Sequence, residues 1–285
     1  MNPTNPPIAG DTRLFAIIGD PIAQAKSPAL FNRLFTELGA NAVLVPLQVP
    51  AAQLDVAIAG LKALANLDGI VVTVPHKVAI LEHLDLLGDH AQAVGAANCM
   101  RRLADGRWQG EMYDGAGFVA GLQSQGIRCA ERRVFLAGCG GAGKAVAHAL
   151  AGAGIAALQL VDSDAQRQDE LATELQAKHP RLQVGEGGQA DTAHELVINC
   201  TPCGMADGDP LPFPIDGLHP DAIVADLIMK PERTPLLLAA EARGHRIHLG
   251  RHLLENQAAL VTRFFGLQSS HPTPVSTTAT QGTNP

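Results

Sequence analysis

Short apolar runs alternate with amphipathic stretches through the first part of the chain. Three apolar runs have the length and composition of buried strands, at residues 14–18, 43–49 and 69–74. Ser27-Pro28 predicts a helix start, with Ser27 as the N-cap and proline at the first helical position. Two helical stripes separate the strands: Leu30, Phe31, Leu34, Phe35 and Leu38 in the first, then Leu54, Ile58, Leu61 and Ala65. This strand–helix–strand order predicts a parallel sheet with helical crossovers.

The alternation of strands and helices is interrupted near residue 104 and starts again after Asp114. A turn at Ala104-Asp105-Gly106 predicts a hairpin that leads to Tyr113-Asp114-Gly115. Beyond it, strands are expected at 133–137, 157–161, 182–184, 196–200, 222–226 and 246–249, and helices at 115–125, 143–153, 166–178, 234–243 and 252–266. The sequence therefore predicts an α/β protein with two domains. The Ser/Thr/Pro-rich segment 268–285 is expected to be a disordered tail.

Composition narrows the class of protein. The 285 residues are 46% hydrophobic and carry a formal charge of −7, which favours a folded body and argues against a nucleic-acid partner. No run reaches the roughly 18 apolar residues of a membrane span, and no signal-peptide core is present, so we expect a cytoplasmic protein without a membrane partner. The five cysteines are expected to be free thiols, and Cys200-Thr201-Pro202-Cys203 lacks the helix that would activate a redox pair. The eleven histidines show no ligand spacing, so no metal is expected.

A glycine-rich turn follows the strand expected at 133–137. Gly138-Cys139-Gly140-Gly141-Ala142-Gly143 ends that strand and opens a helix, which is the context of a dinucleotide fingerprint. Gly138 permits the tight turn, Gly140 lets a pyrophosphate approach the backbone, and Gly143 allows close packing of helix on strand. Gly141 and Ala142 complete the helix N-terminus, which offers N–H donors to the phosphates. The alternative is a glycine-rich turn without a ligand.

Asp162 ends the next expected strand, where an acidic residue binds the adenosine ribose. Its carboxylate can accept from both ribose hydroxyls but repels a 2′-phosphate. Ser163-Asp164 provides no arginine to hold that phosphate, and Arg167 is the nearest cation along the chain. We therefore expect NAD as the cofactor, with NADP less favoured.

Lys77 lies just beyond the strand expected at 69–74, in the segment VVTVPHK (71–77). Ligands of open α/β sheets collect at the C-terminal ends of strands, although one lysine there could equally be a solvated surface residue. Further segments add to this one: GDPIAQAKSP (19–28), GAAN (95–98), YDGAGF (113–118), INCTPCGM (198–205), DLIMKPERTPLL (226–237) and NQAA (256–259). In order and spacing, this set resembles the shikimate/quinate dehydrogenase family over roughly residues 14–266.

The resemblance implies an N-terminal α/β substrate domain (1–113) and a Rossmann dinucleotide-binding domain (114–251), with a C-terminal helix (252–267) that returns to the first. It implies Lys77 and Asp114 as the catalytic pair. It further implies substrate contacts from Ser27, Thr73, Asn98 and Gln257, and cofactor contacts from Thr201 and Gly250. The chemistry fits, because hydride transfer from a carbinol needs a group that accepts the hydroxyl proton, and the reverse needs an acid.

The sequence departs from the family pattern at several substrate positions. Ala25 replaces a serine, Val71 an asparagine, Met112-Tyr113 an asparagine–threonine pair, and Met229 a tyrosine. Each lost hydrogen-bond partner costs about 1–3 kcal/mol, so a weak or altered substrate is expected unless neighbours compensate. The candidate compensating residues are Gln24, Tyr113 and Arg251.

These features favour an NAD(H)-dependent oxidoreductase that acts on a small cyclic hydroxy or keto acid, such as shikimate or quinate, as a monomer or homodimer. Three alternatives stay open. The chain could be an NADP-dependent shikimate dehydrogenase with a compensated pocket, or a related two-domain enzyme acting on folate. It could also be a dinucleotide-sensing regulatory protein without turnover, against which the retention of both Lys77 and Asp114 argues.

Overall fold

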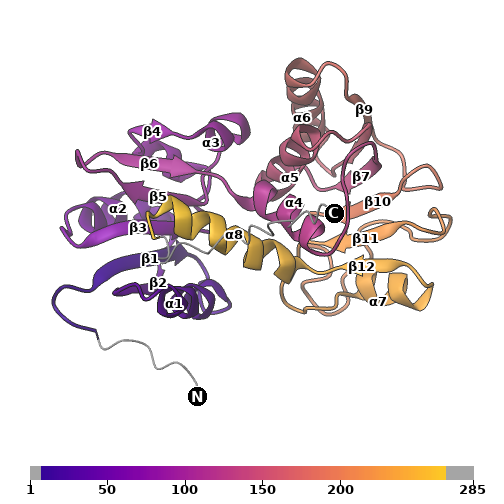
Figure 1. Cartoon of the computed structure of the whole chain (residues 1–285). Coiled ribbons are helices and arrows are strands. Elements are labelled where there is room, and N and C mark those ends of the chain that lie inside the picture. The colour runs from indigo at the N-terminus through magenta and orange to yellow at the C-terminus, as the bar shows by residue number, and fades with distance from the viewer. Residues whose placement is uncertain (1–7, 268–285) are drawn as a thin grey trace, which may run out of the picture.

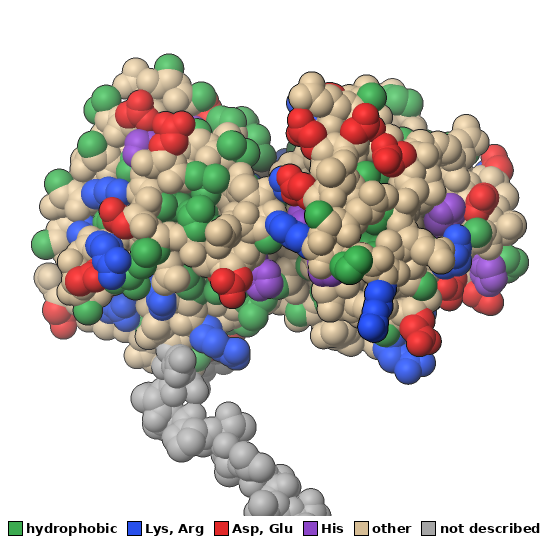
Figure 2. Space-filling view, turned by 90° about the horizontal axis from the view of Figure 1, so that it is seen from above, with side chains coloured by type: hydrophobic (Ala, Val, Ile, Leu, Met, Phe, Trp, Pro, Cys, Tyr) green, Lys and Arg blue, Asp and Glu red, His purple; other side chains and the backbone are tan. Residues whose placement is uncertain are grey.

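Two six-stranded sheets lie side by side in the computed structural model, which describes residues 8–267 (Figure 1). We call each sheet with its covering helices a lobe: the first lobe is built on β2-β1-β3-β5-β6-β4 and the second on β12-β11-β10-β7-β8-β9. Seen from above, the molecule narrows between the two lobes (Figure 2). The tail expected at 268–285 lies outside the described residues.

The first sheet is mixed. β1 pairs in parallel with β2 and β3, whereas β5 and β6 form the expected hairpin and β5 runs antiparallel to β3. Its strands are β1 (Arg13–Gly19), β2 (Ala42–Gln48), β3 (Leu67–Val72), β4 (Leu86–Leu87), β5 (Cys99–Arg102) and β6 (Trp108–Glu111). Its helices are α1 (Ser27–Glu37), α2 (Leu54–Lys62) and α3 (Asp89–Val94), with short 3-10 turns η1 (Ala51–Gln53) and η2 (Ala79–His83).

Alternate side chains of the first sheet enter two separate cores, because successive residues of a strand point to opposite faces. Ala16 and Ile18 pack with residues of α2 and α3, while Phe15 and Ile17 pack with α1 and the end of α8. Both faces are buried, which explains why β1 reads as a continuous apolar run rather than an alternating one.

The second sheet is parallel throughout, and its order places β7 beside both β8 and β10. This is the strand order of a Rossmann fold, in which ligands bind where the connections change direction. Its strands are β7 (Arg133–Ala137), β8 (Ala157–Val161), β9 (Gln183–Glu186), β10 (Leu196–Asn199), β11 (Ile223–Asp226) and β12 (Arg246–His248). Its helices are α5 (Gly141–Gly152), α6 (Ala165–Lys178) and α7 (Pro235–Ala242).

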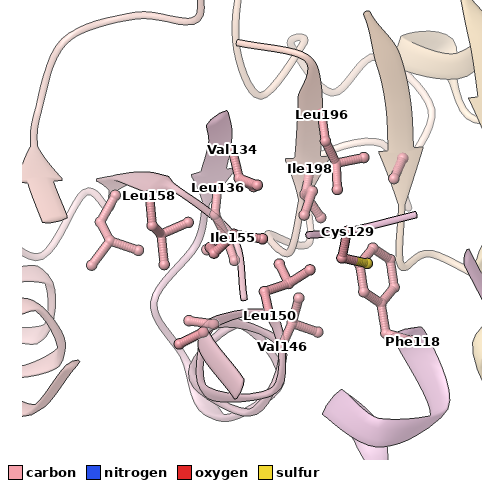
Figure 3. Packing of buried hydrophobic residues seen from close by; sticks show 14 of the residues in the cluster. Phe118, Cys129, Val134, Leu136, Val146, Leu150, Ile155, Leu158, Leu196 and Ile198 are labelled. Atoms are coloured by element: carbon pink, nitrogen blue, oxygen red, sulfur yellow. The ribbon is translucent and has the colours of Figure 1, made fainter. Parts of the chain in front are cut away.

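One face of the second sheet packs against α5, and Figure 3 shows this contact. Val134 and Leu136 of β7 meet Val146 and Leu150 of α5, and all four are completely buried. Apolar side chains on neighbouring strands extend this core, which fixes the position of the turn between β7 and α5. That turn carries the glycine-rich motif.

Two long helices connect the lobes. α4 (Asp114–Ser124) begins at the residue where the sequence divides into two patterns, and it packs against both α5 and α8. α8 (Gly250–Phe264) runs from the second lobe back to the first (Figure 1). Leu253 belongs to the core of the second lobe, whereas Val261 and Phe264 belong to a core of the first. The expected returning helix is therefore confirmed, although it starts two residues earlier than predicted.

The structure corrects three local expectations. Ser27 is the first residue of α1 rather than its N-cap, and no side chain caps this helix. α2 ends at Lys62, so Ala65 lies beyond it. The short elements β4 and α3 were not predicted. Within residues 8–267, no helix has the length and apolar content needed to cross a membrane.

Candidate functional site

The C-terminal end of β3 gathers residues from two neighbouring strands. Thr73 follows β3 directly, and Lys77 lies four residues later on a turn that the buried ring of His76 anchors through the carbonyl of Val49, 2.7 Å away. Asn98 precedes β5, which runs antiparallel to β3 and so begins where β3 ends. The amide of Val72 donates to the carbonyl of Asn98 at 2.7 Å. The sheet therefore brings Lys77 and Asn98 to one edge.

Asp114 is the centre of this arrangement. Lys77 Nζ donates to its Oδ2 at 2.6 Å, while Asn98 Nδ2 and Gln257 Nε2 both donate to its Oδ1, at 2.9 and 2.5 Å. The donors come from the turn after β3, the start of β5 and the middle of α8. Asn98, Asp114 and Gln257 are all buried, and the side chain of Lys77 is 19% exposed. The carboxylate of Asp114 thus bonds to three side chains that lie far apart in the sequence.

Opposing effects act on the Asp114 carboxyl. Burial raises its pKa, but the positive charge of Lys77 and the three hydrogen bonds outweigh burial and leave the pKa below its ordinary value. The carboxylate is therefore anionic at neutral pH and holds the Lys77 ammonium in a fixed direction. An ammonium held in this way can stabilise and protonate an oxygen on the substrate.

Thr73 lies directly after β3, on the turn that leads to Lys77, and Ser27 is the first residue of α1, directly after the loop that follows β1. Ser27 is buried at the start of α1, and the methyl group of Thr73 is close enough to Gly19 that a Cβ there would lie only 2.5 Å from it. Among the described residues, neither hydroxyl has a hydrogen-bond partner. Both are thus available to a ligand.

The substituted positions are apolar in their surroundings as well as in their side chains. Val71 is 7% exposed and packs in the first-lobe core with Cys99. Ala25 borders the same core, and the side chain of Met229 packs against the core of the second lobe. The side chains of Ala25, Val71 and Met229 therefore offer no hydrogen-bond donor to a substrate.

The three candidate compensating residues have other contacts. Gln24 Nε2 donates to the carbonyl of Pro21 at 2.8 Å, and Arg251 pairs with Glu232 at 2.9 Å. Tyr113 is half-buried with its ring edge-on to Phe264, and burial raises the pKa of its phenol to about 12. The Tyr113 phenol therefore stays protonated at neutral pH and cannot serve as a base.

The glycine-rich turn has the geometry of a phosphate cradle. Gly138 has φ +96°, and a Cβ there would lie 2.8 Å from the backbone of Cys200 and Thr201. A Cβ at Gly143 would lie 1.7 Å from the carbonyl oxygen of Gly138, so only glycine permits this approach of helix to strand. By contrast, no atom lies within 4 Å of a Cβ built at Gly140 or Gly141, which leaves their backbone open to a ligand. α5 begins at Gly141, with Ala142 as its second residue.

Asp162 is tied to that turn. Its Oδ2 accepts from the amide of Cys139 at 2.6 Å, and its Oδ1 accepts from the amide of Asp164 at 2.8 Å. Sequence reasoning placed this carboxylate at a ribose but missed its bond to the glycine turn, which joins residues 23 positions apart. The two nearby cations are engaged: Arg167 pairs with Asp164 at 3.2 Å and Lys144 with Glu174 at 2.8 Å.

A second buried carboxylate organises the loops after β10 and β11. Asp226 is fully buried at the end of β11, directly opposite Asn199 in the sheet, and accepts from its side chain at 3.2 Å. Asn199 Oδ1 in turn accepts from the amide and hydroxyl of Thr201, at 2.9 and 2.7 Å. Thr201, an expected cofactor contact, therefore lies on a loop that Asn199 and the buried Asp226 hold in place. No motif in the sequence indicated this network.

Gly250 and the cysteines complete the description of the second lobe. A Cβ at Gly250 would lie 2.6 Å from the carbonyl oxygens of Leu227 and Ile228, so packing alone requires glycine there. Burial raises the pKa of the Cys200 thiol well above its usual value, which disfavours a thiolate. Residues 8–267 contain no group of three or more His, Cys, Asp or Glu placed to hold a metal ion.

Known proteins are similar to this chain in both sequence and fold. The family model described as "Shikimate dehydrogenase substrate binding domain" matches residues 17–100. A curated relative, shikimate dehydrogenase (NADP(+)) of Lysinibacillus sphaericus, is 36% identical over 248 residues, which cover 86% of this chain and 89% of the relative.

Solved structures are similar over almost the whole described chain. Shikimate 5-dehydrogenase of Thermus thermophilus in complex with NADP(H) and shikimate has a TM-score of 0.82 at 29% identity, covering 90% of this chain and 95% of that one. Quinate dehydrogenase of Corynebacterium glutamicum in complex with NAD has a TM-score of 0.81 at 27% identity and the same coverage of 90% and 95%. The 5-ketofructose reductase of a Gluconobacter strain has a TM-score of 0.79 at 29% identity, covering 90% and 94%.

Proposed function

Since the chain belongs to the shikimate dehydrogenase family, we propose that it is an NAD(H)-dependent enzyme that oxidises or reduces a cyclic hydroxy or keto acid, such as shikimate or quinate. The observation that carries the proposal is the convergence of Lys77, Asn98 and Gln257 on the buried carboxylate of Asp114. A structural salt bridge alone does not call for two further amide donors from two other elements.

The residues around Asp114 have distinct roles in this proposal. Lys77 exchanges a proton with the reacting oxygen of the substrate, donating it in reduction and accepting it in oxidation. Asp114 holds the lysine in a fixed direction through the bond from Nζ to Oδ2. Asn98 and Gln257 fix the carboxylate and offer the second N–H of each side-chain amide to substrate hydroxyls, while Ser27 and Thr73 supply hydroxyls at the other end of the substrate.

The glycine-rich turn fits a dinucleotide. Gly140 and Gly141 leave open backbone at the start of a helix, where N–H donors and the helix dipole favour a pyrophosphate. When bound, the cofactor supplies or accepts the hydride, which the protein itself cannot do. The loop that carries Thr201 and the start of α8 at Gly250 border the nicotinamide end in this proposal.

Charge around Asp162 supports NAD over NADP. The carboxylate stands at the end of β8, where a 2′-phosphate would lie, and both neighbouring cations already have acidic partners. A phosphate would have to approach an anion without an available arginine. The competing candidate is NADP, because the named curated relative uses NADP(+).

A panel of substrates and cofactors tests the proposal. Shikimate, quinate and related ring acids are each incubated with NAD and with NADP, and formation of the reduced cofactor is followed by absorbance. We expect turnover that depends on the ring acid and is faster with NAD. A preference for NADP would overturn the cofactor assignment. Cofactor binding without turnover of any ring acid would favour the sensor alternative.

A further inference from the structure

A direct bond joins the loop that leads into α1 at Ser27 to the opposite lobe. Lys26 lies between β1 and α1, immediately before Ser27, and its Nζ donates to the carbonyl oxygen of Met229 at 3.1 Å. Met229 belongs to the loop between β11 and α7 of the second lobe, 203 residues further along the chain. The expected substrate loop is thus attached to the expected cofactor lobe at a single backbone atom.

The acceptor is held rigidly from inside its own lobe. The buried carboxylate of Asp226 accepts from the amide of Ile228 at 3.0 Å and from the hydroxyl of Thr234 at 2.7 Å, which brackets Met229 on both sides. Asp226 and Thr234 are both completely buried. Because the loop is fixed at these two points, the carbonyl of Met229 is a stationary acceptor whose place does not depend on the methionine side chain.

The donor, in contrast, is free to move. Lys26 is exposed, and a lysine-to-carbonyl bond in water is weak, so it can form and break within one turnover. Hydride transfer requires the two reacting carbons to approach to about 3–3.5 Å, and an error of about 1 Å can cost up to 100-fold in rate. A weak bond between the two lobes can therefore matter for rate while contributing little to folding.

We propose that Lys26 is a positioning residue: by donating to the carbonyl of Met229, it sets the separation of the lobes at which a substrate beside Ser27 meets the nicotinamide. The inference rests on the proposed function, because it assumes substrate on the first lobe and cofactor on the second. Lys26 does not contact the reacting atoms; it acts through the loop that ends at Ser27, the first residue of α1.

Substitutions at Lys26 test this role through kinetics. Lys26→Met removes the donor and keeps the length of the side chain, whereas Lys26→Arg keeps a donor. We expect kcat/KM for the ring acid to fall about tenfold in Lys26→Met and to recover to within about threefold in Lys26→Arg. The dissociation constant of NADH, measured by fluorescence, should stay within twofold because the cofactor binds the other lobe.

Two matched lysines serve as controls. Lys230→Met removes an exposed lysine from the same loop as Met229, and should leave kcat/KM within about twofold of wild type. Lys178→Met removes a different bond between the lobes, from Lys178 Nζ of α6 to the carbonyl of Ala93 in α3 at 3.1 Å, away from the substrate loop. A tenfold loss in either control would show that general loss of charge or of lobe contact, rather than Lys26, sets the rate.

A distance measurement tests the same role without turnover. Spin labels on non-natural residues at the exposed positions Val56 in α2 and Leu238 in α7 report the separation of the lobes in the NADH-bound protein. We expect a longer or broader distance distribution in Lys26→Met than in wild type or Lys26→Arg. An unchanged distribution overturns the proposal, and a raised KM in that case means that Lys26 contacts the substrate directly. If no ring acid is turned over at all, the proposed function fails while this measurement still decides the role of Lys26.

Discussion

Replacing Lys77 by methionine separates catalysis from cofactor binding. The side chain of Asp114 is 8% exposed, so the variant leaves a nearly buried carboxylate with two amide donors and no cation. Breaking a buried ion pair costs roughly 3–5 kcal/mol, and the amide bonds that remain should keep the loss of unfolding free energy near the lower value, about 3 kcal/mol. Burial then dominates, and the pKa of Asp114 should rise.

The effect on rate should be larger than the effect on binding. Loss of a positioned acid or base lowers turnover by about 10²–10⁴-fold, and the lower value corresponds to about 2.7 kcal/mol of barrier. NAD affinity should stay nearly constant, because Lys77 lies in the first lobe and the glycine-rich turn in the second. Steady-state kinetics at saturating substrate measure the first quantity, and NADH fluorescence titration the second.

Lys77→Arg is the matched control. Arginine keeps the ion pair with Asp114 but does not release its proton at any working pH, so stability should recover while turnover stays low. If Lys77→Met kept more than about a third of wild-type turnover, proton transfer by Lys77 would be refuted. If Lys77→Arg were as active as the wild type, the lysine would act through its charge alone.

Three further predictions concern the cofactor, the substrate and acid stability. Asp162→Ser with Ser163→Arg should shift the ratio of kcat/KM for NAD and NADP toward NADP, although both values should fall because the glycine turn loses its acceptor; an unchanged ratio would contradict the role of Asp162. Shikimate should be a poor substrate, and Ala25→Ser with Val71→Asn should lower its KM; wild-type kcat/KM above roughly 10⁵ M⁻¹s⁻¹ would show that the pocket is compensated. Burial lowers the pKa of His248 to about 4, so the folded protein binds its proton less readily than the unfolded chain does. Unfolding free energy should therefore fall by roughly 3 kcal/mol from this residue between about pH 6.5 and pH 4, and urea unfolding of His248→Leu should show a shallower decline.

The strands and most helices could be predicted because buried positions carry apolar residues in a pattern that is typical of each element. The runs 133–137 and 157–161 coincide with β7 and β8, since both faces of these strands are covered and every position favours apolar residues. Gly138 and Gly143 were assigned correctly to a tight turn and to a close helix–strand contact. Each position requires glycine, because the neighbouring backbone leaves no room for a side chain.

Elements that depend on residues distant in the sequence have no such local pattern of apolar residues. α3 has only six residues, and the amide of Ala91 in its first turn donates to Glu111 Oε1 on β6 at 2.8 Å, a partner 20 residues away. Ser27 resembled an N-cap locally, yet tertiary packing starts the helix one residue earlier and buries the side chain. Propensity describes a segment by itself, whereas these outcomes depend on what packs against it.

The spacing of Lys77, Asn98, Asp114 and Gln257 along the chain did not reveal their contact. The family resemblance paired Lys77 with Asp114, but the bonds of Asn98 and Gln257 to Asp114 were not predicted. The bonds of Asp162 to Cys139 and of Asp226 to Asn199 were missed altogether. An aspartate that accepts hydrogen bonds from a loop inside the protein has the same local sequence as one that faces solvent. Only the folded structure distinguishes the two.

The path of α8 has a consequence for the order in which the protein can fold during synthesis. The ring of Phe265 stacks on Phe15 with centroids 4.8 Å apart, and Ala258 and Val261 fill the same core. The residues that close the first lobe thus leave the ribosome after the entire second sheet has been made. The second sheet is built from consecutive residues and can form early. The first lobe is translated first, but until α8 has been made, only α1 covers that face of its sheet. Nascent chains halted before residue 250 should therefore expose Phe15 and Phe31 to chaperones, and would lack the Gln257 amide that fixes Asp114.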